Sequence, residues 1–475
     1  MENANRLSKP LLISLVSRFL PSTTYSERTL ALEQAGFNMF NLSSTKISGG
    51  DYLTDSGTGG LLDTQRSVME LADDAYAGST SYQKFEDVFK KITGFKYIFP
   101  VHQGRAAEKV LFGNILDKNS IVFSNALFDT TRAHVEHMGA IGVDLVTPES
   151  MEMGVPHQFK GNINIQELEK QIPLALKNNK NVSACVITVT NNTGGGQPVS
   201  LANIKAAKEV LDRYKIPLII DACRIGENAY FIQQLEGKNR STQSIVQEIF
   251  SYADAFTMSA KKDGISNMGG ALGFNNSKWA DAIKPSVILN EGFLNYGGMS
   301  GKDMEAVAAG FQIAMTEKYL AHRIGQIAYL FNQLKKIDMP MIEPHGGHAV
   351  YVNASKILPN IPAHEFPGHA LACALYIISG VRSCEMGSIM FGRYDDPSDP
   401  KKLTTPHRYE LVRLAIPRLA YSNEILDITI DALQKIKANP HLIPGMMFVE
   451  KPAVLPHFSA TFKPKSTFSL IGIAS

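Results

Sequence analysis

Apolar runs that end in polar residues recur along the chain. The segment Ser183–Thr190 is rich in β-branched residues and predicts a buried strand. A glycine-rich loop, residues 191–198, follows it, and Ser200 is placed to cap a helix. The side chains of one face of that helix recur at helical spacing: Ile204, Ala207, Leu211 and Tyr214. A second apolar run, Ile216–Ile220, comes almost at once, so the pattern predicts a βαβ unit with parallel strands.

Two of these runs end in residues that can carry chemistry. Asp221 follows the run that ends at Ile220, and Ser259-Ala-Lys-Lys-Asp263 follows another predicted strand, Tyr252–Met258. Ligands of open α/β sheets bind beyond the carboxyl ends of the strands. We therefore expect Asp221 and Lys262 to lie at one edge of a mostly parallel sheet.

The pattern changes after about residue 310. A long helical stretch runs through Leu334, and strands are predicted around His348–Val352 and Val412–Ile416. A last helix begins at Ser422 or Asn423 and ends at Asn439-Pro440, where proline stops it. These elements predict a second, smaller α+β domain.

Composition limits the classes of function. The 475 residues are 44% hydrophobic and 19% charged, as in an ordinary globular protein. The 47 basic and 45 acidic residues leave a net charge of +2 with the signs mixed along the chain, so no footprint for nucleic acid or an anionic membrane is expected. No apolar run approaches the ~20 residues needed to span a bilayer. The partners are expected to be small molecules or proteins.

The four cysteines lie far apart in the sequence and form no Cys-x-x-Cys pair: Cys185, Cys223, Cys373 and Cys384. Such spacing argues against a disulfide framework and against a cysteine-rich metal site. A stretch near the N-terminus, Pro10–Leu20, is interrupted by Ser14, Ser17 and Arg18, and we interpret it as part of a folded arm and not as a signal peptide. A reducing compartment, the cytoplasm, is the expected location.

The residues at the strand ends suggest pyridoxal phosphate. This cofactor needs an amine that bonds to its aldehyde, an anion beside its pyridine nitrogen and N–H donors for its phosphate. Lys262, Asp221 and the turn Gln103–Arg105 supply these in order, and Ser259 adds a hydroxyl. A helix that begins at Gly104 would direct its first amides at the phosphate. Taken one at a time, paired lysines are more often solvated surface residues, and an aspartate after a strand is more often a cap or turn residue.

Eight separated segments, in order along the chain, resemble the β-eliminating lyases, the family of tryptophanase and tyrosine phenol-lyase. The segments are Leu53–Thr58, Asp74–Ser79, His102–Arg105, Gly195–Ser200, Glu227–Ile232, Met258–Asp263, Gly346–Ala349 and Arg413–Arg418. The resemblance implies the aspartate aminotransferase type of fold (fold type I), pyridoxal phosphate as cofactor and a homotetramer of paired dimers. It also implies a division into an N-terminal arm (1–50) that joins the small domain and makes subunit contacts, a large cofactor-binding domain (51–310) and a C-terminal small domain (311–475).

The resemblance assigns roles to individual residues. Lys262 would hold the cofactor and remove the α-proton of the substrate, and Tyr76 would donate a proton to the leaving group. The other cofactor contacts would come from Gln103, Gly104, Arg105, Phe128, Asn192, Asp221, Arg224 and Ser259. Arg413, with Thr54 and Ser56, would receive the substrate carboxylate, and Lys261, Tyr296 and His348 would complete the polar network.

The family also binds a monovalent cation, usually potassium. The carbonyl oxygens of Gly57 and Asn267 and the side chain of Asp74 are the candidate ligands. Asp74 stands where the family usually has glutamate, which is one methylene longer, so this site is expected to differ from the family's pattern.

Three positions favour L-tryptophan, cleaved to indole, pyruvate and ammonia, over L-tyrosine. The phenol-lyases carry threonine, arginine and phenylalanine where this chain has Asp129, Met386 and His457. An indole N–H is only a donor, so a carboxylate such as Asp129 suits it, with His457 in support. Met386 offers a flexible, polarizable surface for a flat ring.

Alternatives remain open at this point. Asp129 could simply cap the segment that begins at Thr130, and Met386 and His457 could be packing residues. Arg132 and Asn267 follow the phenol-lyase pattern, so cleavage of L-tyrosine is the second candidate. A catalytically silent protein that still binds the cofactor is the third.

Overall fold

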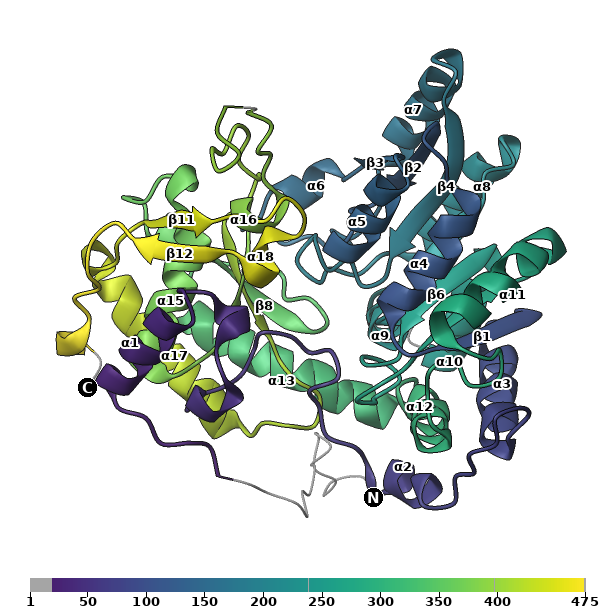
Figure 1. Cartoon of the computed structure of the whole chain (residues 1–475), viewed down its shortest axis with the longest axis horizontal. Coiled ribbons are helices and arrows are strands. Elements are labelled where there is room, and N and C mark those ends of the chain that lie inside the picture. Colours follow the sequence, from purple (N-terminus) through teal and green to yellow (C-terminus); the bar gives the residue numbers. More distant parts are fainter. Residues whose placement is uncertain (1–18, 238, 397, 474–475) are drawn as a thin grey trace. The chain divides into compact units, whose positions relative to one another are not determined.

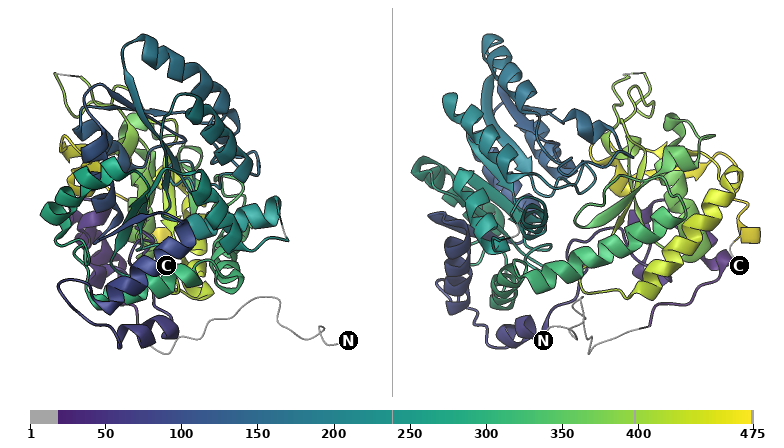
Figure 2. Two further views of the ribbon diagram at one scale, coloured as in Figure 1. Left: turned by 90° about the vertical axis from the view of Figure 1, so that its right-hand side faces the viewer. Right: turned by 180° about the vertical axis from the view of Figure 1, so that it is seen from behind.

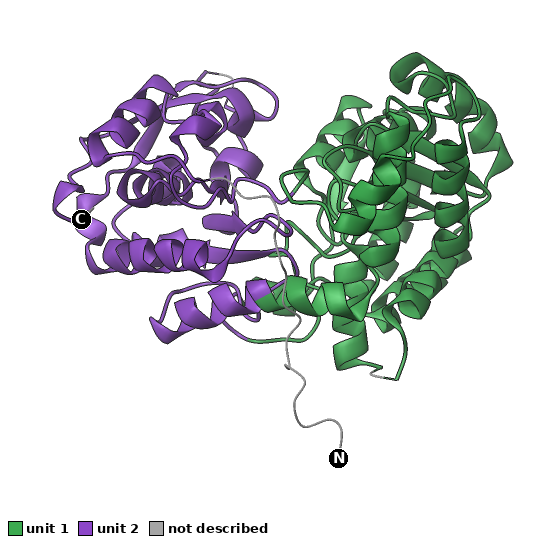
Figure 3. Ribbon diagram, turned by 90° about the horizontal axis from the view of Figure 1, so that it is seen from below, with its two compact units in different colours: residues 1–12, 56–152, 156–325 green, residues 13–55, 153–155, 326–475 purple. Residues whose placement is uncertain are grey.

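The structure is a computed structural model, and it describes residues 19–237, 239–396 and 398–473. The described chain divides into two compact units (Figure 3). Unit 1 contains Ser56–Glu152 and Pro156–Gly325, whereas unit 2 contains residues 19–55, Met153–Val155 and residues from Gln326 onward. Among the described residues, no helix is both long enough and apolar enough to cross a membrane.

Unit 1 is built on a seven-stranded sheet with the order β1-β7-β6-β5-β4-β2-β3 (Figure 1). All neighbouring strands are parallel except β7, which runs antiparallel to both β1 and β6. The strands are β1 (Tyr97–Val101), β2 (Ser120–Ser124), β3 (Ile141–Asp144), β4 (Asn181–Thr188), β5 (Leu218–Asp221), β6 (Ala255–Ser259) and β7 (Gly270–Phe274). The predicted mostly parallel sheet is confirmed.

The central strands of this sheet are apolar on both faces because helices cover both (Figures 1 and 2). In β5, Leu218 and Ile220 belong to one hydrophobic core and Ile219 to another. The first core is completed by α3 (Thr80–Thr93), α7 (Ile165–Lys177), α8 (Leu201–Arg213), α9 (Ile225–Leu235), α10 (Thr242–Tyr252) and α12 (Gly301–Ile313), and the second by α4 (Gly104–Ile115), α5 (Asp129–His137) and α11 (Ser277–Glu291). Two short helices, α2 (Asp63–Met69) and α6 (Pro148–Met151), complete unit 1.

The predicted βαβ unit is confirmed as β4, α8 and β5, and Ser200 caps α8 by accepting a hydrogen bond from the Asn203 amide. Two details of the sequence-based prediction are wrong. Tyr214 does not share the buried face, because the helix ends at Arg213 and the Tyr214 side chain is exposed. The helical stretch from residue 310 is also not continuous, since α12 ends at Ile313 and α13 (Glu317–Lys336) begins after a turn in which the Thr316 amide bonds to the Ile313 carbonyl.

Unit 2 contains two antiparallel sheets. The first has the order β8-β10-β9, and the second pairs β11 with β12. The strands are β8 (Ala349–Asn353), β9 (Cys384–Met386), β10 (Leu411–Ala415), β11 (Met446–Glu450) and β12 (Thr461–Pro464), and the helices are α1 (Tyr25–Gln34), α14 (Ala354–Ile357), α15 (Pro367–Ser379), α16 (Ser388–Phe391), α17 (Asn423–Ala438) and α18 (Pro456–Ser459).

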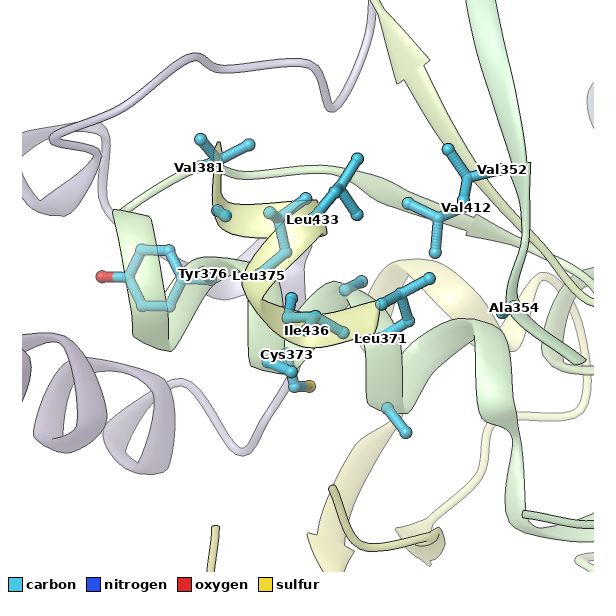
Figure 4. Packing of buried hydrophobic residues seen from close by; sticks show 14 of the residues in the cluster. Val352, Ala354, Leu371, Cys373, Leu375, Tyr376, Val381, Val412, Leu433 and Ile436 are labelled. Carbon is cyan, nitrogen blue, oxygen red and sulfur yellow. The ribbon is translucent and has the colours of Figure 1, made fainter. Parts of the chain in front are cut away.

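The core of unit 2 lies where α15 and α17 pack beside β8 and β10 (Figure 4). Leu371 and Leu375 of α15 lie near Leu433 and Ile436 of α17 in this cluster (Figure 4), and each of them is fully buried. Residues from α1 and the following turns complete the same core. The first 18 residues of the predicted N-terminal arm, including most of Pro10–Leu20, lie outside the described residues.

The compact units do not divide where the sequence predicts domain boundaries. The N-terminal division falls after Asp55 instead of residue 50, and the C-terminal one falls within α13 instead of after residue 310. The helix α12 belongs to unit 1 because it packs on α2 and α3. The sequence pattern marks where element types change, but such helix packing decides which unit an element joins.

A buried ion pair joins two helices of unit 1. The guanidinium Nε of Arg323 in α13 lies 3.1 Å from the Glu227 carboxylate in α9, and both side chains are inaccessible to solvent. Charges buried in this way destabilise the fold strongly when one partner is lost, because the other remains buried without compensation.

We predict that Glu227→Gln lowers the free energy of unfolding by about 3 to 5 kcal/mol, the usual effect of breaking a buried ion pair. Denaturant unfolding measures it. The matched control is Glu167→Gln, which removes an exposed partner of Lys170 and should leave stability nearly unchanged. Equal effects in the two variants would contradict the prediction.

Candidate active site

Three parallel strands of unit 1 bring their carboxyl ends to one edge. Thr188 of β4 pairs with Asp221 of β5, and Asp221 pairs in turn with Thr257 of β6. The loops that follow the three strands carry Asn192, Arg224 and Lys262, and they leave the sheet at the same level. The expected meeting of Asp221 and Lys262 at one sheet edge is therefore confirmed.

Residues of these loops line a pocket that is open to solvent. It is lined by Ser56, Gln103, Gly104, Arg105, Glu108, Phe128, Thr130, Asn192, Asp221, Cys223, Arg224, Ser259, Lys261 and Lys262. All the residues expected to contact the cofactor are among them, and all belong to unit 1. Whether they make those contacts stays a prediction.

One end of the pocket suits a phosphate group. The helix α4 begins at Gly104, as predicted, and no side chain caps its N-terminus. Its first amides and its positive dipole end are therefore available to an anion. A Cβ at Gly104 would lie 2.7 Å from the Cβ of Ser259, so only glycine lets this helix start so close to β6. Arg105 adds a positive charge, and the donor set fits the phosphate of pyridoxal phosphate.

Two lysines lie at the other side of the pocket. Lys262 is partly buried, and its amine makes no hydrogen bond or ion pair with another described residue, which leaves a primary amine available to an aldehyde. Burial, together with the positive charges of Lys262 and Arg105, lowers the pKa of Lys261 below its usual value. The Asp221 carboxylate lines the same pocket and accepts a hydrogen bond of 3.3 Å from the Cys223 amide. An amine, a carboxylate and a phosphate site thus fit pyridoxal phosphate.

Asp263 fixes the segment that holds Lys262. Its Oδ2 accepts hydrogen bonds from the Gly226 and Glu227 amides at the start of α9, at 2.7 and 3.4 Å. The side chain is fully buried. The sequence analysis gave this residue no role, although it closes the Met258–Asp263 segment. An aspartate next to the expected catalytic lysine was the available signal.

Glu108 is a second residue that the sequence analysis missed. It lies on α4, lines the pocket and accepts hydrogen bonds from the Thr130 and Thr131 hydroxyls at 2.8 and 2.5 Å. Burial first, and then the charge of Asp221, raise the pKa of Glu108 to about 7, against the effect of the two hydroxyls. Its spacing of four residues from Gly104 puts it on the same helix face one turn later. That spacing was the signal.

Other predicted residues of unit 1 lie outside the lining of the pocket. Tyr76 is exposed and stacks on Phe293, and its ring meets that of Tyr296 edge-on at 5.5 Å. Asp129 is buried at the start of α5, where its carboxylate accepts a hydrogen bond of 2.6 Å from the Thr130 amide. The N-cap of α5 is Phe128 and no side chain caps this helix, so Asp129 is not its cap residue, and contact of Asp129 with a substrate stays a prediction.

The candidate cation ligands also lie in unit 1. The Asn267 amide nitrogen donates to the Gly57 carbonyl at 3.0 Å, so these two residues are in direct contact. The Asp74 carboxylate accepts a hydrogen bond of 2.6 Å from the Gly301 amide. Within the described ranges, no group of three or more His, Cys, Asp and Glu side chains is placed to hold a metal.

Unit 2 holds the residues expected at the substrate carboxylate, apart from Ser56. Arg413 lies in the middle of β10, and its guanidinium donates to the Leu53 carbonyl at 3.1 Å, next to Thr54. His348 is fully buried, and its Nε2 lies 3.2 Å from the Tyr351 hydroxyl. The pairing of Arg413 with the Leu53–Thr54 backbone brings together two residues that are far apart in the sequence.

The expected specificity residues of unit 2 are buried. Met386 lies on β9 opposite Leu411, in a small cluster with Tyr351 and Tyr409. His457 lies in α18 and lines a small cavity together with Cys384, Glu385 and other residues of unit 2. Contact of either residue with a substrate stays a prediction.

Solved structures share this fold. An aspartate aminotransferase variant from Thermus thermophilus matches with a TM-score of 0.57 and 13% identity, over 81% of this chain and 96% of that one. The serine palmitoyltransferase of Sphingomonas wittichii matches with a TM-score of 0.54 and 12% identity, over 83% of this chain and 88% of that one. The predicted aspartate aminotransferase-like fold is thereby confirmed.

Sequence comparison covers almost the whole chain. Proteins named tryptophanase from Salinibacter ruber and Haemophilus influenzae are 43% and 41% identical to it, over 94% and 98% of this chain and 93% and 99% of theirs. The tryptophanase of Rhodobacter capsulatus is 42% identical over 93% of this chain and 96% of its own length. The family model described as beta-eliminating lyase matches residues 51–432. The chain therefore belongs to the β-eliminating lyase family.

Proposed function

We propose that this protein is a lyase that cleaves L-tryptophan to indole, pyruvate and ammonia with pyridoxal phosphate as cofactor. The observation that carries the proposal is the pocket of unit 1, which gathers Lys262, Asp221 and the N-terminus of α4. The relatives support the choice of substrate, because each is named tryptophanase and the match covers more than nine tenths of its length.

Different residues of the pocket would bind different parts of the cofactor. The amides of α4, with Arg105 and Ser259, hold its phosphate, and Asp221 holds a proton on its pyridine nitrogen. Phe128 would pack on the ring, and Asn192 and Arg224 would contact its phenolic oxygen. When bound, the cofactor supplies an electron-accepting ring that stabilises the electron pair left by a departing α-proton.

Side chains move the protons. The Lys262 amine takes the α-proton of the substrate, and Tyr76 donates a proton to the aromatic carbon that leaves. A general acid or base of this kind contributes roughly 10² to 10⁴ in rate. Burial and the charges of Lys262 and Arg105 lower the pKa of Lys261, so this second amine loses its proton more easily than an exposed lysine does.

Substrate binding uses different groups. Arg413, with Thr54 and Ser56, binds the substrate carboxylate, where a planar guanidinium can pair with both oxygens. Tyr296 and His348 complete the polar surroundings. At the leaving ring, Asp129 accepts the indole N–H with His457 in support, and Met386 packs on the flat ring.

Three further properties belong to the same proposal. Gly57, Asp74 and Asn267 contribute to a site for a monovalent cation such as potassium, since a carbonyl oxygen has a second lone pair beside the bond it already accepts. The enzyme works as a homotetramer, and it works in the cytoplasm, where thiols such as the four of this chain stay reduced.

The first prediction of the proposed function is that purified protein with pyridoxal phosphate releases pyruvate and indole from L-tryptophan, and that Lys262→Ala abolishes this release. The physical reason is that Lys262 supplies both the amine that bonds to the cofactor aldehyde and the base that takes the α-proton. Pyruvate and indole are measured with L-tryptophan and with L-tyrosine, in the presence of potassium or lithium.

Faster release of pyruvate from L-tyrosine than from L-tryptophan would contradict the assignment of L-tryptophan as the substrate, but it would not contradict the proposed cofactor site. A rate that does not change when lithium replaces potassium would contradict the cation site. A protein that binds pyridoxal phosphate but releases no pyruvate from either substrate would contradict the activity itself.

The specificity residues generate a second prediction. A triple variant with the substitutions Asp129→Thr, Met386→Arg and His457→Phe should lose at least 100-fold in kcat/KM for L-tryptophan, because the indole N–H then has no acceptor. The comparison is with Asp129→Asn, which keeps an oxygen acceptor and should lose much less. A triple variant that keeps its preference for tryptophan would contradict the assignment.

Glu108 generates a third prediction. Since its pKa is raised to about 7, its carboxyl is mostly protonated near pH 6 and ionised near pH 8. The ionised form adds negative charge beside Asp221 and stabilises the protonated pyridine nitrogen. Glu108→Gln should therefore bind pyridoxal phosphate roughly tenfold more weakly than the wild type at pH 8 but about equally at pH 6. Equal affinity at both pH values, measured by cofactor titration, would contradict this role.

A further inference from the structure

Two buried glutamates flank the segment that carries Met386. Glu385 precedes Met386 on β9, and Glu410 lies just before β10, the strand that pairs with β9. Their side chains are 5% and 4% exposed. Neither residue belongs to the pocket of unit 1, and the proposed reaction does not use them.

The two carboxylates converge on Gly387. A Cβ on Gly387 would lie 2.5 Å from Oε2 of Glu410 and 2.6 Å from Oε1 of Glu385, so the two acids approach each other across this glycine. Only a residue without a side chain leaves room for both. Two like charges at such separation in a buried site repel strongly.

Hydrogen bonds account for one oxygen of each acid. Oε1 of Glu410 accepts from the amide and the hydroxyl of Ser388, and Oε1 of Glu385 accepts from the Ile389 amide at 3.2 Å. Oε2 of each is buried without a hydrogen-bond partner among the described residues. Within the same residues, no ion pair joins either carboxylate to a basic side chain.

An ionised carboxylate can only accept hydrogen bonds, so the buried Oε2 atoms of the two acids would both remain unsatisfied while both acids are ionised. One proton removes the repulsion and turns one acid into a donor for the other. We propose that Glu385 and Glu410 share one proton, with Glu385 as the donor, and that this pair positions Met386. Glu410 is the acceptor because both donors of Ser388 already favour its ionised form. The effect on Met386 rests on the proposed function, whereas the shared proton does not.

The pKa values agree with this arrangement. Burial and the charge of Glu410 raise the pKa of Glu385 well above its usual range, and burial raises that of Glu410 to about 7. Other titratable groups face the pair from neighbouring elements. Tyr394 lies close enough that both acids raise its pKa, Cys384 adjoins Glu385, the His407 amide bonds to Ser388, and His369 of α15 and His457 of α18 line a cavity with Glu385.

The direction of the pH effect follows. An acid whose pKa is raised by folding contributes stability that is fully present below the pKa of the unfolded chain, about 4.3 for glutamate. That contribution is lost as the pH rises through the folded pKa, which is about 7 for Glu410. The wild type should therefore lose stability as the pH rises above about 4.3; the contribution of Glu410 is lost by about pH 7, and that of Glu385, the acid that holds the shared proton, is lost at higher pH.

The test compares Glu385→Gln and Glu410→Gln with Glu33→Gln, which changes an exposed acid on α1. In Glu385→Gln, the new side-chain amide donates permanently to Glu410. This variant should have the Tm of the wild type near pH 4 and a higher Tm near pH 9, with at least about half of the wild-type pH dependence removed. Glu410→Gln should be less stable than the wild type at every pH, because it loses the charged acceptor of Ser388. Glu33→Gln should follow the wild type throughout.

Infrared difference spectra supply a second readout. The wild type at neutral pH should show the carbonyl band of a buried protonated carboxyl that is absent in Glu385→Gln. With L-tryptophan, KM should rise with pH in the wild type while kcat stays constant, and Glu385→Gln should remove that rise.

Parallel Tm profiles of Glu385→Gln and the wild type, or absence of the infrared band, would overturn the shared proton. A gain of stability in Glu410→Gln would overturn the choice of donor, and a Tm profile that flattens when potassium is added would show a bound cation instead. If L-tryptophan is not the substrate, only the KM arm loses its meaning, so failure of the proposed function and failure of this inference are distinguishable.

Discussion

The register of β4, β5 and β6 is the constraint on which the pocket depends. Parallel pairing of Thr188, Asp221 and Thr257 puts three strand ends at one level, and every loop that lines the pocket from this side starts there. A shift of one residue would turn Asp221 to the other face of the sheet. The apolar residues of β5 prevent that shift, because Ile219 and its neighbours fill separate cores on the two faces. The same burial that stabilises the sheet therefore positions the chemistry.

Charged groups at this edge are arranged by their hydrogen bonds. Asp263 accepts hydrogen bonds from the amides at the start of α9. These bonds attach the segment that carries Lys262 to the helix that follows Asp221. The buried pair of Glu227 and Arg323 holds the same helix against α13. A lysine amine thus lies at a fixed strand end without an acidic partner of its own. That arrangement keeps the amine available for covalent chemistry, since an ion pair would hold it in the charged form.

Local pattern was sufficient for the sheet of unit 1 and for much of its pocket. The βαβ unit, the start of α4 at Gly104 and the meeting of Asp221 with Lys262 follow from periodicity and strand ends, which depend on neighbours in sequence. Arg413 and the Leu53–Thr58 segment could be placed together only through the resemblance, because the hydrogen bond from Arg413 to the Leu53 carbonyl joins residues far apart in the chain. Glu385 and Glu410 gave no usable signal in the sequence, and the only signal for Glu108 was its spacing of four residues from Gly104. A glutamate in a helix or strand is usually solvated, and only the packing of the whole unit shows that these three are buried.

Each of the two units contains buried carboxyl groups that form no ion pair with a basic side chain among the described residues. Glu108 and Glu410 both have a pKa raised to about 7. Glu108 accepts hydrogen bonds from two threonine hydroxyls, and the nearby charge of Asp221 raises its pKa. Glu410 accepts hydrogen bonds from the amide and the hydroxyl of Ser388, and its neighbouring acid is Glu385. A buried carboxyl group without a basic partner costs stability when it ionises. Glu108 lines the pocket that is proposed to bind the cofactor, and Glu385 adjoins Met386. In both units, therefore, a buried carboxyl group lies beside a residue that the proposed reaction uses. We infer that these carboxyl groups are kept for the charge or proton they hold and not for packing.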